Sequence, residues 1–242
     1  MRDLSTVVLI PTRGMVPIEV ACAWVGLGMP QNQGCRGFLP EKGREVGAAY
    51  ETLFGSVIIR DESILRYGEQ YVDQFLGAKW IVTLEEDNIP GPKAIVDLLA
   101  AIHTCVDCGE EVGRAEDGSE KDEWTCASGH RGLDGVAALY YMKTDPPIPM
   151  AFGDPATPGD FRPLSVAGAI EAEQLLECNG IPMGCAIFRK AAVAQVSRPW
   201  FKTEGTQDIY FCRKAKEEIG SRFAVATWVR CAHMDAATGR IW

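Results

Sequence analysis

The chain has 242 residues, of which 47% are hydrophobic, and its net charge is −9. This length fits one large domain or one domain with an insertion, and the acidic charge without a basic run argues against binding to a nucleic-acid polymer. No apolar stretch reaches the roughly 18 residues that indicate a transmembrane helix, and the N-terminus lacks a signal-peptide pattern. We therefore expect a cytoplasmic protein without a transmembrane segment.

The first predicted strand, Thr6–Ile10, ends in a loop that contains Pro11, Thr12 and Arg13. A loop in this place can hold a nucleotide, and a guanidinium group can pair with a phosphate or contact a base. These loop residues are therefore candidates for nucleotide binding, although a simple turn is an equally plain explanation of the sequence.

The segment that follows alternates between apolar stretches and polar breaks. One stretch has apolar residues at helical spacing, and one break is rich in Gly, Pro and polar residues, which is typical of a loop. We expect helices at Val16–Leu27, Glu45–Phe54 and Ile64–Leu76, a loop at Gln31–Lys42, and a short strand at Ser56–Ile59.

An acidic triplet directly follows the next predicted strand. Trp80–Leu84 is apolar and partly β-branched, which predicts a buried strand, and Glu85, Glu86 and Asp87 come immediately after it. Ligands of open α/β sheets bind beyond the carboxyl ends of strands, and clustered carboxylates attract a cation. Hard oxygen ligands suit Mg²⁺ or Mn²⁺. The alternative is a solvated acidic turn.

Two short cysteine-containing motifs interrupt the α/β pattern. Cys105, Cys108, Cys126 and His130 have the spacing C-x2-C-x17-C-x3-H, which matches a tetrahedral zinc site. Surface thiols or a redox-active C-x-x-C would leave Cys126 and His130 unexplained. We expect a zinc-ribbon-like insertion at residues 104–132 with a structural Zn²⁺, since its polar sequence builds no hydrophobic core.

The second half of the chain returns to alternating strands and helices. We expect strands at Gly135–Met142, Cys185–Phe188 and Phe223–Val229, a long loop at Thr144–Pro163, and a helix at Gln207–Ile219 that ends at a glycine. A loop of this length inside a compact domain is often functional.

Three further residues are candidates for ligand contacts. Gly184 permits close approach of the backbone to a ligand, although an ordinary glycine turn is the alternative. The ring of Trp200 could stack on a sugar face of an acceptor. Asp208 lies in the first turn of a helix, where an acid stabilises any helix, so its position alone does not require a chemical role.

The order of these motifs resembles that of GT-A glycosyltransferases, especially family 2-like enzymes. The acidic triplet corresponds to their DxD segment, with Glu85 in place of the first Asp, and the loop that begins at Pro11 corresponds to their nucleotide-binding loop. The resemblance, which covers nearly the full chain apart from the zinc-binding insertion, implies a single α/β domain over residues 1–242, with a mixed, mainly parallel sheet flanked by helices.

The same resemblance implies roles for individual residues. Asp208 corresponds to the general base, although the acid that usually precedes it is a glutamine here. His233, after the last strand, corresponds to a metal ligand, so Asp87 and His233 would bind Mn²⁺ or Mg²⁺ with the first acid of the triplet assisting. Arg66 corresponds to the arginine of an Arg-Asn pair near the donor, but no asparagine follows it.

The implied reaction is the transfer of a sugar from a nucleotide-sugar donor to an acceptor hydroxyl, with inversion at the anomeric carbon. A metal ion would offset the charge on the departing diphosphate. Two other functions agree with the same residues: a nucleotidyltransferase, which also uses acidic metal ligands on an α/β sheet, and a non-catalytic module that binds a protein partner through its zinc ribbon.

Overall fold

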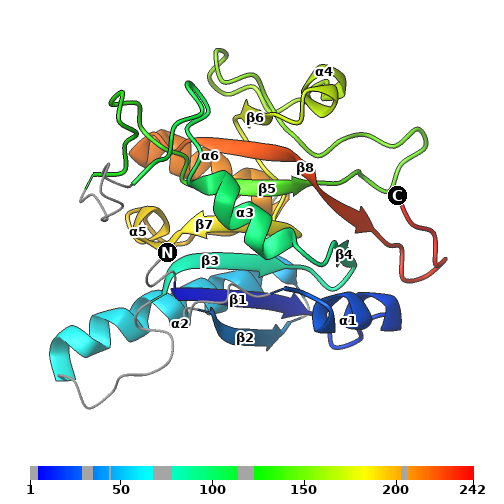
Figure 1. Cartoon of the computed structure of the whole chain (residues 1–242). Coiled ribbons are helices and arrows are strands. Elements are labelled where there is room, and N and C mark those ends of the chain that lie inside the picture. The colour runs from blue at the N-terminus through cyan, green and yellow to red at the C-terminus, as the bar shows by residue number, and fades with distance from the viewer. Residues whose placement is uncertain (1–4, 29–34, 44, 68–77, 114–122, 203–205) are drawn as a thin grey trace.

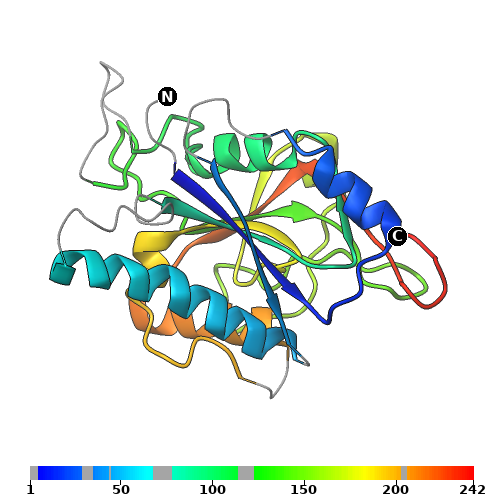
Figure 2. The ribbon, with the colours of Figure 1, turned by 90° about the horizontal axis from the view of Figure 1, so that it is seen from below.

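The chain forms one mixed β-sheet with helices on both faces (Figures 1 and 2). The structure is a computed structural model, and it describes residues 5–28, 35–43, 45–67, 78–113, 123–202 and 206–242. The strands are β1 (Ser5–Thr12), β2 (Cys35–Lys42), β3 (Ala78–Leu84), β4 (Asn88–Pro90), β5 (Gly135–Leu139), β6 (Leu175–Cys178), β7 (Cys185–Arg189) and β8 (Phe223–His233). The helices are α1 (Ile18–Val25), α2 (Val46–Tyr67), α3 (Ala94–Ile102), α4 (Ala167–Glu171), α5 (Lys190–Val193) and α6 (Gln207–Ile219).

The strand order is β2-β1-β3-β7-β5-β8-β4, and β6 also pairs with β8. Strands β2, β1 and β3 are parallel to one another, and β7 is antiparallel to both β3 and β5. Strand β8 is parallel to β5, whereas β4 and β6 are antiparallel to β8. Most strands therefore run in one direction, which confirms the predicted mixed, mainly parallel sheet flanked by helices.

Each face of the sheet has its own hydrophobic core. Successive side chains of a strand point to opposite faces, and β1 shows this directly: Val7 and Leu9 pack on one side, Val8 and Ile10 on the other. The first side is covered by α2 and α6, and the second by α3, as Figure 2 shows. Within the described ranges, every helix is too short or too polar to span a lipid bilayer.

Two predicted segments near the N-terminus were wrong. The predicted loop Gln31–Lys42 contains strand β2, while residues 31–34 lie outside the described part of the chain. Its Gly and Pro content is typical of a loop, but Pro40 is tolerated because β2 lies at the edge of the sheet. The predicted strand Ser56–Ile59 lies inside the continuous helix α2.

The continuity of α2 has a clear physical cause. Tyr50, Leu53, Phe54 and Val57 are buried, and their spacing places them on one face of a helix. This face packs on the sheet as part of the larger core. The β-branched residues near position 58 favour a strand locally, but burial of the helical stripe outweighs that preference.

Other predicted elements agree closely with the structure. Helix α6 has the predicted bounds, and Gly220 ends it in the left-handed conformation with φ 63°, as expected for a glycine that caps a helix. Helix α1 lies within the predicted Val16–Leu27. Strand β8 is longer than predicted and ends at His233, a difference that matters for the site.

Candidate active site and metal centre

The carboxyl ends of β1, β3 and β8 lie at the same edge of the sheet, because these strands run in the same direction. Strand β4 follows β3 in the chain and pairs with β8. In the antiparallel pairing of β4 with β8, Asn88 lies opposite His233, and Met234 N donates a hydrogen bond of 2.7 Å to Asp87 O. This pairing brings Asp87 beside His233, although the two residues are far apart in the sequence.

The side chain of Asp87 lies between two basic groups. Lys143 Nζ is 2.6 Å from Asp87 Oδ2, and His233 Nε2 is 3.6 Å from the same oxygen. Burial raises the pKa of the Asp87 carboxyl, but its contacts with His233 and Lys143 outweigh burial and hold that pKa well below its usual value. Asp87 is therefore an ionised carboxylate.

The donor set of Asp87 and His233 suits a divalent cation. His233 Nδ1 is 2.8 Å from Tyr141 O, so its N–H donates to this carbonyl, and Nε2 is the ring nitrogen that faces Asp87 and would bind a divalent ion. We assign this tautomer from the hydrogen-bond network. A carboxylate oxygen and an imidazole nitrogen are suitable ligands for Mn²⁺, with phosphate oxygens able to complete the coordination.

Glu85 occupies a different environment from Asp87. Tyr50 Oη donates to Glu85 Oε1 at 3.2 Å, and Gln207 Nε2 donates to the same oxygen at 3.3 Å. Burial, together with the charges of Asp87 and Asp208, raises the pKa of Glu85 to about 8, despite these two hydrogen bonds. In the absence of a bound cation, Glu85 thus keeps its proton to a higher pH than an ordinary glutamate does.

Asp208 lies in the first turn of α6 and is only 7% exposed. Burial raises the pKa of its carboxyl above the usual value, although hydrogen bonds from Thr206 and from the backbone N–H of Ile209 oppose this effect. The helix N-terminus alone would lower the pKa, but burial has the stronger influence and the pKa rises. A raised pKa makes the ionised group a stronger base.

Glu86 joins the loop after β1 to the loop after β3. Its Oε2 accepts hydrogen bonds of 2.7 Å from Thr12 Oγ1 and from Arg13 N, and its Oε1 accepts one from Arg13 Nε. Glu86 is 5% exposed, whereas the Arg13 side chain is 60% exposed. Glu86 therefore fixes the loop, and the guanidinium of Arg13 remains accessible to a ligand. Pro11 is buried at the end of β1.

The ligand contact predicted for Gly184 is not supported. Gly184 N donates to Tyr140 Oη at 2.8 Å, and Gly184 O accepts from Glu85 N at 2.9 Å, so both backbone groups are used within the protein. A Cβ atom here would overlap the side-chain amide of Asn88 and lie 2.5 Å from Tyr140 Oη. The glycine is needed so that these side chains can pack around the backbone that supports Glu85.

The acceptor contact predicted for Trp200 is not supported either. Trp200 is 3% exposed and belongs to the core under α2. Its Nε1 donates to Val196 O at 2.8 Å, and its ring meets Phe54 edge to face. A ring buried in this way cannot stack on a sugar.

The donor contact predicted for Arg66 conflicts with the continuity of α2. Tyr50 in the first part of this helix contacts Glu85, and Arg66 lies near its C-terminal end. At 1.5 Å per residue, the backbone of Arg66 is about 24 Å further along the helix. The side chain of Arg66 lies outside the described part of the structure, but its backbone is far from the acidic edge.

Lys143 and Tyr50 also belong to the site, although no sequence motif indicates them. Each contacts an acid of the triplet, yet Lys143 is 56 residues and Tyr50 is 35 residues away from its partner. Neither lies in a motif that predicts its partner. The pairings arise from the register of the sheet and the packing of α2.

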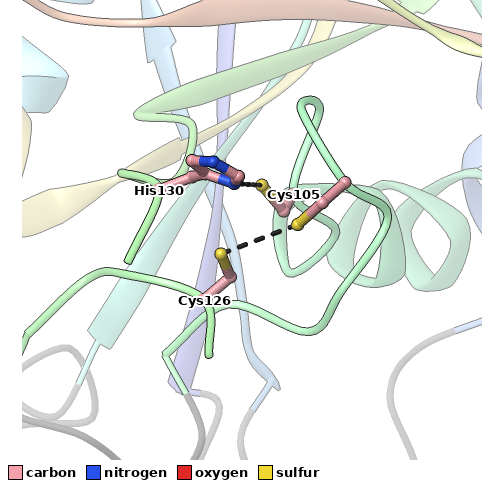
Figure 3. Close-up of side chains that lie close together, drawn as sticks. Cys105, Cys126 and His130 are labelled. Carbon is pink, nitrogen blue, oxygen red and sulfur yellow. Dashed lines mark hydrogen bonds between the residues drawn. The ribbon is translucent and has the colours of Figure 1, made fainter. Parts of the chain in front are cut away.

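A second cluster, formed by Cys105, Cys108, Cys126 and His130, could hold a metal such as zinc, as predicted (Figure 3). Their ligand atoms all lie within 4.8 Å of one another. Cys108 Sγ is 3.7 Å from Cys126 Sγ, and Cys105 Sγ is 3.8 Å from His130 Nδ1. Ligands about 2.3 Å from a tetrahedral zinc ion are about 3.7 Å apart, so the spacing fits zinc.

The cysteine-containing segment is attached to the sheet by packing and by ion pairs. Trp124 packs against Trp80 of β3, with ring centroids 5.4 Å apart, and Val112 is fully buried. The segment therefore has more apolar packing than its polar composition indicates. Arg222, just before β8, donates to Asp107 at 2.9 Å and to Arg131 O at 2.6 Å.

These contacts place the zinc-binding cluster at the edge of the sheet where β5 and β8 begin. The acidic site lies where β3 and β8 end, on the opposite edge (Figure 1). Arg222, which directly precedes β8, also donates to Glu177 of β6 at 2.8 Å. The segment that carries the cluster is therefore connected to β6 and to the start of β8. A position away from the acidic residues agrees with a structural contribution of the metal.

Comparison with known proteins shows the fold of this chain but does not assign the chain to a family. No family model matches the chain, and no curated protein has a significantly similar sequence. The crystal structure of A197 from STIV is similar over 100% of this chain and 93% of its own length, with a TM-score of 0.59 and 15% identity.

TarS 1-349 from S. aureus aligns with 96% of this chain, which spans 59% of the TarS structure, at 11% identity and a TM-score of 0.43. That score is too low to support an inference about this chain. The similarity to A197 extends over the whole chain, at an identity that concerns the fold alone. The chain therefore shares the mixed α/β fold of A197 from STIV.

Proposed function

We propose that this protein is a metal-dependent glycosyltransferase, which transfers a sugar from a nucleotide-sugar donor to an acceptor hydroxyl with inversion at the anomeric carbon. One observation carries the proposal: Asp87 Oδ2 lies 3.6 Å from His233 Nε2, at the same sheet edge where the buried carboxyl of Asp208 is close enough to raise the pKa of Glu85. A cation site beside a basic carboxylate is what this reaction requires.

The donor would bind at the ends of β1 and β3. Glu86 holds the backbone of the Thr12–Arg13 loop in place, so little conformational freedom is lost when a ligand binds there. The exposed guanidinium of Arg13 can pair with a phosphate of the donor. When bound by Asp87 and His233, Mn²⁺ or Mg²⁺ supplies positive charge to the diphosphate.

The acceptor would be activated by Asp208. Its carboxylate takes the proton of the acceptor hydroxyl, while the acceptor oxygen forms a bond to the anomeric carbon. The bond from that carbon to the diphosphate breaks, and the electron pair leaves with the nucleoside diphosphate. Burial, which raises the pKa of Asp208, favours the proton transfer. General base catalysis typically contributes about 10²–10⁴-fold.

In this proposal, the Zn²⁺ bound by Cys105, Cys108, Cys126 and His130 is structural. Support comes from the position of the cluster at the edge of the sheet opposite the acids, and from its links to the strands through Trp124 and Arg222. The zinc ligands belong to an insertion of residues 104–132 in a single catalytic domain.

A donor screen with product identification tests the proposal. The purified protein is incubated with Mn²⁺ and each of several nucleotide-sugars, and binding is first detected as a rise in the melting temperature, because a ligand of the folded state stabilises it. Released products are then identified for the donors that bind. Free nucleoside diphosphate supports glycosyl transfer, whereas pyrophosphate indicates nucleotidyl transfer.

The matched control is Asp87→Asn, which keeps the size of the side chain and removes the charge at the cation-binding pair. This variant should lose the Mn²⁺-dependent part of the stabilisation by the donor. If no nucleotide-sugar stabilises the protein and none is consumed, the proposed function is wrong, and a non-catalytic binding module is the better description.

A further inference from the structure

The carboxylate of Asp87 is paired with a lysine that no motif assigns to the site. Lys143 Nζ lies 2.6 Å from Asp87 Oδ2, the oxygen that also faces His233 Nε2 at 3.6 Å. The side chains of Lys143, Asp87 and His233 are 28%, 17% and 14% exposed. The ammonium group thus binds the same carboxylate oxygen that a divalent cation would need.

An ammonium group and a divalent cation cannot bind one carboxylate oxygen independently. Both carry positive charge, and two like charges a few ångströms apart repel strongly in a half-buried site. Binding of a divalent ion to Asp87 and His233 therefore requires Lys143 Nζ to move away from Asp87. The affinity of the site for metal includes the cost of breaking this ion pair.

The surrounding structure allows the side chain of Lys143 to move without its backbone. Met142 N donates to Ile148 O at 2.8 Å, and Trp242 Nε1 donates to Thr144 O at 3.0 Å. These bonds hold the chain on both sides of Lys143. The four-carbon stem of lysine is flexible, so its ammonium group can leave Asp87 and remain close to the site.

We propose that Lys143 is an exchangeable cation of the Asp87 site: it neutralises the carboxylate when no divalent ion is bound, and it pairs with the diphosphate of the ligand once the ion displaces it. The second half of this inference rests on the proposed function, because it takes the ligand to be a diphosphate. The first half, competition between Lys143 and the metal ion, does not depend on the reaction.

Manganese binding to Lys143→Met tests the first half. The zinc-loaded protein is titrated with MnCl₂, and free Mn²⁺ is followed by its electron paramagnetic resonance signal. Because an ion pair of this kind is worth up to about 1 kcal/mol, which is about a factor of five, its removal should tighten Mn²⁺ binding about fivefold. Unchanged or weaker Mn²⁺ binding by a folded Lys143→Met variant would overturn the proposal.

Two variants control for charge and for position. Lys143→Arg keeps the positive charge and should bind Mn²⁺ like the unaltered protein. Lys214→Met removes an equally short ion pair, Lys214 Nζ to Glu218 Oε1 at 2.6 Å on α6, and should leave Mn²⁺ affinity unchanged. If Lys214→Met tightens Mn²⁺ binding as much as Lys143→Met, the effect is one of net charge and the proposal fails.

Binding of inorganic pyrophosphate in saturating Mn²⁺, measured by calorimetry, tests the second half. Lys143→Met should bind manganese pyrophosphate about fivefold or more weakly, opposite in sign to its effect on Mn²⁺ alone. Equal pyrophosphate affinity would remove Lys143 from the phosphate site. Neither titration contains a sugar donor, so an absence of glycosyl transfer would refute the proposed function and leave the result for Lys143 intact.

Discussion

Glu85→Gln should stabilise the protein at alkaline pH. Burial and the charges of Asp87 and Asp208 raise the pKa of Glu85 to about 8, from an ordinary value of 4.5. Between these two pH values the folded protein holds a proton that the unfolded chain has released, so the free energy of unfolding falls as the pH rises. At about 1.4 kcal/mol per pH unit, the loss is at most about 5 kcal/mol.

Glutamine is neutral at every pH in this range, and it can still accept the hydrogen bonds from Tyr50 and Gln207. The variant should match the unaltered protein near the ordinary pKa of a glutamate and exceed its stability by a few kcal/mol about one pH unit above the raised pKa. Urea unfolding at both pH values, without added Mn²⁺ or Mg²⁺, measures the difference. Glu217→Gln, at an exposed position of α6, is the control and should keep the original pH profile. Identical profiles for Glu85→Gln and the unaltered protein would refute the reasoning.

Two further predictions concern metal content and packing. Protein purified without added zinc should contain about one equivalent of Zn²⁺, and Cys126→Ser should lower this content in elemental analysis; zinc content that is zero, or unaffected by the substitution, contradicts the assignment. Gly184→Ala should lower the free energy of unfolding by about 2–4 kcal/mol, because the new methyl group overlaps Asn88 and Tyr140 and displaces the Tyr140 hydrogen bond. Gly168→Ala is its control in the same denaturation assay, since a Cβ there meets nothing within 4 Å, and it should stabilise α4 by up to about 1 kcal/mol; equal effects of both substitutions would contradict the packing argument.

Local signals in the sequence were sufficient to predict elements that are bounded by residues with a strong local preference, such as a capping glycine. Helix α6 was predicted with its bounds, because its start and its capping Gly220 are both local features. The acidic triplet and the zinc ligands were likewise found from the sequence, the first from its place after a buried strand and the second from spacing. The structure brings the zinc ligands together as their spacing requires.

The sequence could not predict features that depend on the sheet. Strand β2 contains a proline that only an edge position permits. The Val57 region of α2 has β-branched residues that favour a strand locally, but burial of the helical stripe of Tyr50, Leu53, Phe54 and Val57 favours the helix. The partners of the acidic triplet, Tyr50 and Lys143, are set by helix packing and strand register. His233 was reached only through the resemblance to glycosyltransferases, because a lone histidine has no local signature.

The rate of sugar transfer by Asp208→Asn is the most direct test of the central claim that the acidic edge performs base-assisted glycosyl transfer. Asparagine keeps the size of the side chain and removes its basicity at a position that is 7% exposed. With a donor identified in the screen, the variant should fold, bind the donor with near-normal affinity, and transfer sugar at least about a hundredfold more slowly. Unchanged turnover by the folded variant would contradict the account and leave Asp208 as a helix-start residue.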